Sequence, residues 1–145
     1  ILVVFGSFGR IWASLYIEGN KTKKLITAGP FSVVRNPLYF FSLVILIGFC
    51  LALKSIYLPL GLLFIFIIFH VPTIVNEERK LKDVHGIDFK EYVQSTPRLI
   101  PNWFKYKKPN PTDKVLVKIS RINTVLLEVI GLLFLYTLID ILYFL

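Results

Sequence analysis

Apolar residues occur in this chain as long blocks separated by shorter polar segments. Residues 37–53 and residues 56–75 contain no charged side chain, and only Lys54 and Ser55 lie between them. A helix rises about 1.5 Å per residue and needs roughly 20 apolar residues to cross the hydrocarbon core of a bilayer. The second block has this length, and the first is slightly shorter. The pattern therefore predicts two transmembrane helices joined as a tight hairpin.

Two further apolar blocks lie near the ends of the sequence. Residues 1–17 include Arg10, and residues 122–145 include Glu128 and Asp140. We expect both blocks to be helical. The second would be an additional C-terminal span, whose acidic groups pair with a helix of an upstream segment that the sequence does not include or lie near the interface. The sequence has no methionine and opens inside an apolar block, so we also expect an upstream segment that it does not include.

Together these blocks predict an all-α, polytopic membrane protein that forms a single membrane domain over residues 1–145. The alternative is a soluble protein with buried core helices, but such helices more often have about 10–14 apolar residues. The composition also favours the membrane. Hydrophobic residues make up 55% of the chain and charged residues 18%, whereas soluble domains have about 25% charged residues.

The polar segment before the last block divides into two parts. Residues 76–94 have the pattern of a cytoplasmic helix that is interrupted at Gly86. Residues 96–114 are rich in proline, which predicts an extended loop along the membrane surface. The aromatic residues expected to anchor this loop at the interface are Trp103, Phe104 and Tyr106.

Basic residues set the expected orientation of the chain. Its net charge is +8, and its lysines and arginines lie mainly in residues 18–35 and 76–121, whereas the opposite side has only Lys54. Cytoplasmic loops carry such an excess, so we place both basic segments in the cytoplasm. The charge suits a face near anionic lipid, and no groove-reading motif is present. The expected partner is the lipid bilayer and not a nucleic acid.

Several kinds of site find no support in the sequence. Cys50 is the single cysteine, so it cannot form an internal disulfide. Together with His70 and His85 it gives no cluster with metal-ligand spacing, and we expect no metal site. A Walker loop, a GxGxxG fingerprint and a GxSxG elbow are also absent.

Polar residues at the ends of the predicted hairpin are the candidates for chemistry. Arg35 stands at the entry to a span, and Glu77 and Glu78 follow the exit of the next one. The purely structural alternatives are a snorkelling arginine and carboxylates paired with Arg79 and Lys80 on the surface of their own helix.

A histidine in a span is a further candidate. His70 lies near the end of residues 56–75, and polar groups at such positions are often functional. The structural alternative is a ring nitrogen bonded to a helix carbonyl.

Two separated motifs resemble a known family. Residues 25–39 read LITAGPFSVVRNPLY, which resembles the tGPy..vRHPxY signature of the isoprenylcysteine carboxyl methyltransferase-like family, a relative of the membrane phospholipid methyltransferases. About forty residues later, residues 76–81 read NEERKL, followed by His85-Gly86, Phe89, Tyr92 and RLIP at 98–101. This is similar to the family's EE..L...fG..Y..Y....r.iP. The resemblance covers residues 22–104, which would be the cofactor-binding core.

The resemblance implies a multi-pass integral membrane methyltransferase with a cytoplasmic pocket for S-adenosyl-L-methionine and a lipophilic or lipid acceptor. It implies candidate catalytic roles for Glu77, Tyr39 and Arg35. Glu77 would accept a hydrogen bond from the cofactor's ammonium, while Tyr39 and Phe31 would pack against the adenine or face the sulfonium. The positions that it assigns to cofactor contacts are Leu25, Ile26, Phe31, Asn36, Pro37, Leu38, Tyr39 and Glu77, with Arg35 and Glu78 as second choices.

Two departures from the family pattern bear on function. Asn36 stands where the signature has a histidine, and Thr73 stands where the prenylcysteine enzymes carry a substrate-binding arginine. The second departure argues against a prenylcysteine carboxylate as acceptor. Two alternatives stay open: a phospholipid N-methyltransferase acting on an ethanolamine head group, and a non-catalytic membrane scaffold that retains the fold.

Overall fold

The computed structural model describes residues 1–17, 24–52, 57–109 and 119–144, and these form helices and connecting segments without any strand. The expectation of an all-α protein is therefore confirmed. The helices are α1 (Leu2–Ile17), α2 (Pro30–Val33), α3 (Pro37–Ala52), α4 (Tyr57–Ser95), the 3₁₀ turn η1 (Trp103–Lys105) and α5 (Ile119–Phe144).

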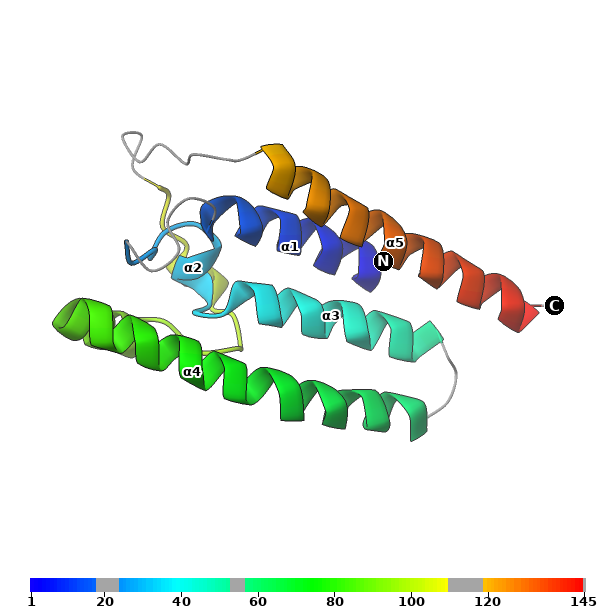
Figure 1. Ribbon diagram of the computed structural model, residues 1–145, viewed down its shortest axis with the longest axis horizontal. Helices are drawn as coiled ribbons and strands as arrows, with labels where there is room; N and C mark the ends of the chain where they lie inside the picture. Colours follow the sequence, from blue (N-terminus) through cyan, green and yellow to red (C-terminus); the bar gives the residue numbers. More distant parts are fainter. Residues whose placement is uncertain (18–23, 53–56, 110–118, 145) are drawn as a thin grey trace.

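The four long helices lie alongside one another, and α2 caps one end of the bundle (Figure 1). α1 and α4 run toward that end, whereas α3 and α5 run away from it. The closest pair is α1 and α3, because small residues let their backbones approach. A Cβ added at Gly6 would lie 2.6 Å from Ile45 Cγ1 and 2.9 Å from the Phe41 carbonyl oxygen. Small residues serve the same purpose at helix contacts in membranes.

α4 is the one helix, among the described residues, that is long and apolar enough to cross a membrane. Only 6% of its most apolar window is buried within the protein. The other apolar helices, Leu2–Ile17, Pro37–Leu51 and Leu126–Leu135, are shorter. Large apolar side chains of α4 that face outward include Leu60, Phe64, Ile65, Ile68 and Phe69.

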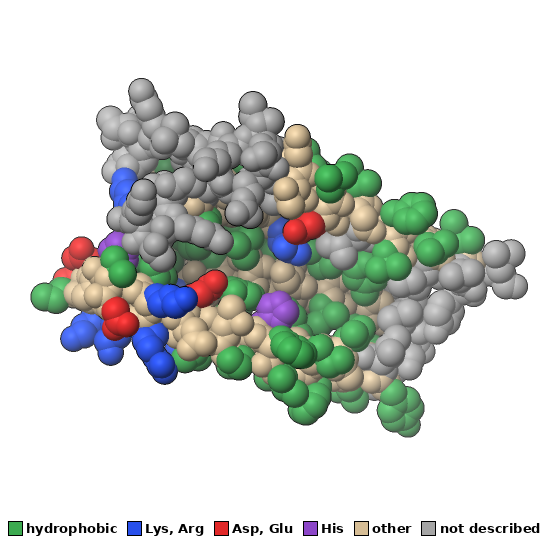
Figure 2. Space-filling model, viewed as in Figure 1, with side chains coloured by type: hydrophobic (Ala, Val, Ile, Leu, Met, Phe, Trp, Pro, Cys, Tyr) green, Lys and Arg blue, Asp and Glu red, His purple; other side chains and the backbone are tan. Residues whose placement is uncertain are grey.

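Charged and apolar side chains occupy different ends of the molecule. Lysine and arginine side chains gather at the end where α4 finishes, and hydrophobic side chains cover much of the remaining visible face (Figure 2). A large exposed apolar area is unusual for a soluble protein. Acidic side chains lie at the same end as the lysines and arginines (Figure 2).

α4 joins two elements that the sequence pattern predicts separately. It continues from the apolar block into the charged segment without a loop. The predicted interruption at Gly86 is confirmed, because this residue has φ 50° and ψ −109°. Residues with a Cβ rarely adopt such a positive φ, whereas glycine does so readily. The chain reverses there, and the arm that follows buries Phe89 and Tyr92.

The segment after α4 is an extended loop that lies along α2. Arg35 N donates to the Pro97 carbonyl at 2.8 Å, and Asn102 N donates to the Val33 carbonyl at 3.0 Å. The predicted extended loop is confirmed for residues 96–109, apart from the turn η1, and residues 110–114 lie outside the described part. Its aromatic residues Trp103, Phe104 and Tyr106 are exposed; their role as interfacial anchors stays a prediction.

Candidate functional site

The first motif folds into a turn, a short helix and a second turn. Gly29 has φ 60° and precedes Pro30, which occupies the first position of α2. A side chain at Gly29 would collide with the ring of Tyr16. Val34 is extended, and Pro37 then begins α3, where proline suits the first helical turn. This path delivers Arg35 and Asn36 to the side of α4.

Glu78 is the centre of a hydrogen-bonded cluster at this junction. Its Oε1 accepts from Asn36 Nδ2 at 3.0 Å and from Arg35 Nη1 at 3.2 Å. Arg98 donates to both carboxylate oxygens, from Nε to Oε1 at 3.2 Å and from Nη2 to Oε2 at 2.8 Å. The Glu78 side chain is only 11% exposed. A carboxylate at this depth requires charged partners and hydrogen bonds, and these three residues supply them.

The geometry of this cluster contradicts the two structural alternatives, a snorkelling Arg35 and a Glu78 paired on its own helix. Arg35 does not snorkel, since its side chain is 11% exposed and is paired with Glu78. Glu78 pairs across the fold and not with Arg79 or Lys80 on its own helix. Asn36 Nδ2 also lies 3.3 Å from the Arg98 carbonyl. The cluster thereby ties the start of α3, the middle of α4 and the segment after α4 together.

A cavity of about 300 Å³ lies beside this cluster. Its wall includes all eight residues to which the family resemblance assigns cofactor contacts. Arg35 also lines the cavity, whereas Glu78 does not. The residues that line it are Ile17, Lys24, Leu25, Ile26, Phe31, Arg35, Asn36, Pro37, Leu38, Tyr39, Glu77, Lys80, Leu81 and Tyr92. The structure thus brings together residues from four separate segments; the roles assigned to them stay predictions.

The wall of this cavity combines charged and apolar groups. Glu77, which lies beside the Tyr39 phenol, is the carboxylate of the lining. Cationic groups come from Lys24, Arg35 and Lys80. The remaining surface is mainly aliphatic and aromatic. Ligand pockets typically show this mixture of apolar walls with a few placed polar groups.

Tyr92 supports the cavity from the second arm of α4. Its hydroxyl donates to the Phe31 carbonyl at 2.7 Å. Burial raises the pKa of this phenol above its ordinary value, so it remains a donor. The bond holds α2 against α4 and keeps Phe31 in the cavity wall. Sequence reasoning gave Tyr92 and Arg98 no role, although both stand at motif positions.

His70 lies next to the cavity without lining it. Its Nδ1 is 3.1 Å from the Phe66 carbonyl, so the structural alternative of a bond to a helix carbonyl is confirmed. The ring stacks on Phe66 at a centroid distance of 4.1 Å and meets Tyr39 edge-on at 5.5 Å. With Nδ1 protonated, Nε2 carries the lone pair. Thr73 donates to the Phe69 carbonyl on its own helix at 2.8 Å.

The acidic residue of the last helix has its partner within the chain. Arg10 Nη2 of α1 lies 3.0 Å from Glu128 Oε2 of α5. The expected partner of Glu128 was a helix outside the given sequence or the membrane interface, whereas the structure pairs it with Arg10 of α1. The side chain of Asp140 lies outside the described part of the structure. No group of three or more His, Cys, Asp or Glu side chains that could hold a metal occurs among the residues described.

Comparison with known proteins agrees with the two motifs. The family model described as phospholipid methyltransferase matches residues 1–87. The chain is 33% identical over 99 residues to the nickel-cobalt-cadmium resistance protein NccN of Alcaligenes xylosoxydans xylosoxydans, covering 68% of this chain and 46% of that protein. It is 32% identical over 105 residues to the cobalt-zinc-cadmium resistance protein CzcN of Cupriavidus metallidurans, covering 72% and 48%.

The chain spans about half the length of the curated relatives it matches. No solved structure matches it. The family model covers more than half of the chain and includes the first motif and the acidic pair, so the resemblance read from the sequence is confirmed. The chain belongs to the phospholipid methyltransferase family.

Proposed function

We propose that this chain forms the membrane domain of a multi-pass methyltransferase that binds S-adenosyl-L-methionine in the cavity beside Glu77 and methylates a lipophilic acceptor. The observation that carries the proposal is that Glu77 and eight residues of the segment 25–39 line one cavity. Glu77 is far from the other residues in the sequence, and their position in one cavity wall supports a shared role in binding a ligand.

The chemistry of the lining fits this cofactor. The cavity volume of about 300 Å³ lies at the lower end of the range for small-molecule sites, which is about 300–1,000 Å³. Glu77 would accept hydrogen bonds from the ammonium group. Lys24, Lys80 or Arg35 would pair with the carboxylate, and Phe31 would pack against the adenine. When bound, the cofactor supplies a methyl group on a positively charged sulfur.

The residues of the chain would contribute mainly by positioning. Methyl transfer is an in-line displacement, so alignment and exclusion of water account for most of what a protein can add. Tyr39, which lies beside Glu77, would help to fix the carboxylate that orients the cofactor. For an amine or thiol acceptor, Glu77 or the Nε2 of His70 would take up the proton.

The proposed setting is a bilayer crossed by α1, α3, α4 and α5. The four helices lie side by side (Figure 1), and outward-facing apolar residues occur on each of them, for example Phe8, Ile47, Phe64 and Phe134. Placing the basic end in the cytoplasm follows the positive-inside rule. The cavity would then open at the cytoplasmic interface, where an acceptor dissolved in the membrane can reach it laterally.

Radiolabelled methyl transfer tests this function. Membranes containing the protein would be incubated with methyl-labelled S-adenosyl-L-methionine, and the lipid extract separated by chromatography. We expect label in the extract with the wild type and with Glu91→Gln, which changes an exposed acid of α4 outside the cavity. Glu77→Gln should lower the labelling at least tenfold. Labelling that is equal in all three samples would contradict the proposal.

The same extract addresses a second candidate that the family description favours. A phospholipid N-methyltransferase would produce labelled mono- and dimethylated ethanolamine lipids. Label in another lipophilic product would exclude that acceptor. A folded protein that labels no product, with the cofactor bound or not, would favour the non-catalytic scaffold.

The names of the two relatives suggest a physiological setting for the reaction. Both names refer to metal resistance, and we propose that methylation of a membrane component contributes to tolerance of such metals. Growth on cobalt or cadmium would be compared in cells that carry the wild type, Glu77→Gln or Glu91→Gln. Lower tolerance with Glu77→Gln alone would link resistance to the cavity, whereas equal tolerance would contradict this link.

A further inference from the structure

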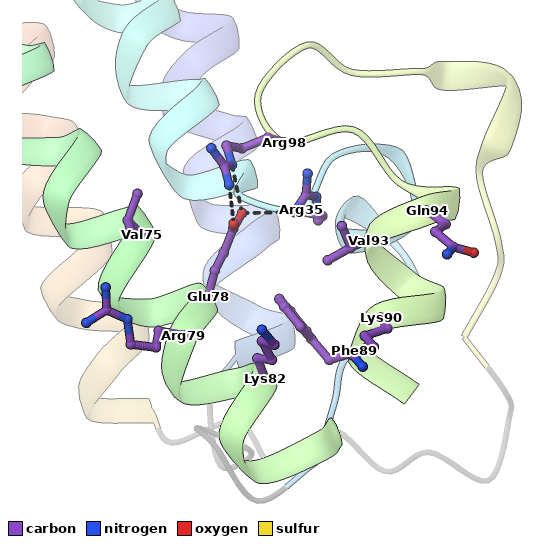
Figure 3. Close-up of a pocket in the computed structure, with 10 residues that line it drawn as sticks. All are labelled: Arg35, Val75, Glu78, Arg79, Lys82, Phe89, Lys90, Val93, Gln94 and Arg98. Atoms are coloured by element: carbon purple, nitrogen blue, oxygen red, sulfur yellow. Dashed lines mark hydrogen bonds and ion pairs between the residues drawn. The ribbon is translucent and has the colours of Figure 1, made fainter. Parts of the chain in front are cut away.

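A second pocket lies on the other side of Glu78 (Figure 3). It has a volume of about 530 Å³ and lies between the two arms of α4 that meet at Gly86. The residues that line it are Arg35, Val75, Glu78, Arg79, Lys82, Phe89, Lys90, Val93, Gln94 and Arg98. The two pockets share Arg35 alone, so this one is a separate site.

The lining of this second pocket is strongly cationic. It has five basic side chains and a single carboxylate, Glu78. That carboxylate already accepts hydrogen bonds from Arg35, Asn36 and Arg98. The acidic residues nearby on α4, at positions 83, 88 and 91, do not line the pocket. The residues that line the pocket therefore carry more positive than negative charge.

Four of the cations have donors that nothing in the described part of the chain occupies. Arg79, Lys82 and Lys90 make no ion pair or side-chain hydrogen bond with a described residue. Arg35 uses Nη1 for Glu78, but its Nε is buried and has no partner among the described residues. A buried donor without an acceptor is unfavourable, and among these cations Arg35 Nε is the buried one. Arg79, Lys82 and Lys90 are exposed, so their charged groups are accessible to a ligand.

The position of the pocket along α4 indicates where an acceptor would come from. Val75, the last residue of the apolar block, forms one wall, and the charged residues Arg79 and Lys82 follow on the next turns. Phe89, which is 4% exposed, forms the floor from the other arm. A pocket that begins where the apolar face of a membrane helix ends lies at the depth of lipid head groups.

We propose that this pocket binds the phosphate group of an anionic ligand, with a membrane lipid as the source that its depth favours. Phosphate oxygens are strong acceptors, and they suit both the planar fork of arginine and the ammonium of lysine. Lys82 and Lys90 would approach the phosphate from opposite arms of α4, with Arg79 beside them. Binding would hold the two arms together at the Gly86 reversal. The site does not depend on the proposed methyl transfer.

Calorimetric titration of the detergent-solubilised protein tests this site. The probes are dihexanoyl phosphatidic acid, inorganic phosphate and, as a zwitterionic comparison, dihexanoyl phosphatidylcholine. We expect phosphatidic acid to bind more tightly than phosphatidylcholine. The double variant Lys82→Gln, Lys90→Gln should weaken its binding about thirtyfold, since each of the two lysines near an anionic lipid contributes about 1 kcal/mol. The control Lys107→Gln, Lys108→Gln removes the same charge from exposed positions outside the pocket and should leave binding unchanged.

The remaining outcomes distinguish a lipid phosphate from free phosphate and from a general charge effect. Inorganic phosphate that binds as tightly as the lipid, and is lost in the Lys82 and Lys90 variant alone, would identify a site for free phosphate. Equal losses in both double variants would reveal only a general charge effect and would overturn the proposal. Absence of binding by both phosphate probes in folded wild-type protein would also overturn it. Cofactor binding is measured separately, so either site can fail alone.

Discussion

The side-chain amide of Asn36 donates a hydrogen bond to Glu78 Oε1 at 3.0 Å, across 42 positions of sequence. Asn36 is the position at which the family signature has a histidine. Because its amide faces Glu78 and the Arg98 carbonyl, the residue holds the start of α3 against α4. A neutral histidine carries one N–H donor, against two in the amide, so it can replace the bond to Glu78 but not both bonds at once. The bond to Glu78, which is the shorter of the two, is thus one that either residue can make.

Asn36→His should therefore change cofactor affinity by less than about threefold, which is well under the 1.4 kcal/mol that a tenfold change requires. Asn36→Leu, which removes the donor, should lower the free energy of unfolding by about 1–3 kcal/mol. Calorimetry and thermal unfolding in detergent provide the two measurements. A gain in affinity of more than tenfold for Asn36→His would mean that the asparagine has impaired the site.

Arg98 is predicted to stabilise the fold through its two bonds to Glu78. Its side chain is 51% exposed, so Arg98→Ala should lower the free energy of unfolding by about 1–2 kcal/mol, toward the weaker end for charged hydrogen bonds. Arg98→Lys should restore part of this, since lysine lacks the bidentate fork. Thermal unfolding is compared with Arg79→Ala, whose side chain has no described partner. Equal effects of Arg98→Ala and Arg79→Ala would contradict the assigned role.

Position 86 is predicted to require glycine because of its backbone conformation, and not because a side chain would lack room there. A Cβ at this position would meet nothing within 4 Å, but φ is +50°. Gly86→Ala should therefore cost about 1–2 kcal/mol in free energy of unfolding. Gly61→Ala is the matched control, because it also lies in α4 with open space around it. That change should be neutral or stabilising by up to about 1 kcal/mol. Similar unfolding temperatures for the two variants would refute the argument.

The ion pair between Arg10 and Glu128 should couple α1 to α5. At 3.0 Å and partly exposed on both sides, the pair has the character of a polar contact between membrane helices. A double-mutant cycle with Arg10→Gln and Glu128→Gln should give a coupling of about 0.5–1.5 kcal/mol. Unfolding in detergent of the two single variants and the double variant provides this value. Strictly additive effects would show that the contact contributes nothing.

The features that follow from local pattern could be predicted from the sequence. Helices in all four apolar blocks, the break at Gly86 and the extended path after residue 95 depend on periodicity, hydropathy and backbone preference. The gathering of residues 25–39 and Glu77 followed from the family resemblance, which carries information on distant contacts that no local pattern holds.

The features that depend on long-range geometry could not be predicted. Adjacent residues of a helix point about 100° apart, so the two glutamates point in different directions. Sequence alone does not say that Glu77 faces the first cavity and Glu78 the cluster with Arg35 and Arg98. The pairing of Arg10 with Glu128 spans 118 positions and depends on how α1 and α5 pack. The continuity of α4 into its charged arm likewise needs the packing of Phe89 and Tyr92.

The central claim is that the cavity beside Glu77 holds S-adenosyl-L-methionine. The most direct test is calorimetric titration of the detergent-solubilised protein with this cofactor and with S-adenosyl-L-homocysteine. We expect both to bind at micromolar concentration. Glu77→Gln should weaken binding by about 1.5–3 kcal/mol, the scale of a charged hydrogen bond, whereas Glu91→Gln should have no effect. Failure of the folded wild-type protein to bind either ligand, or unchanged affinity in Glu77→Gln, would contradict the account.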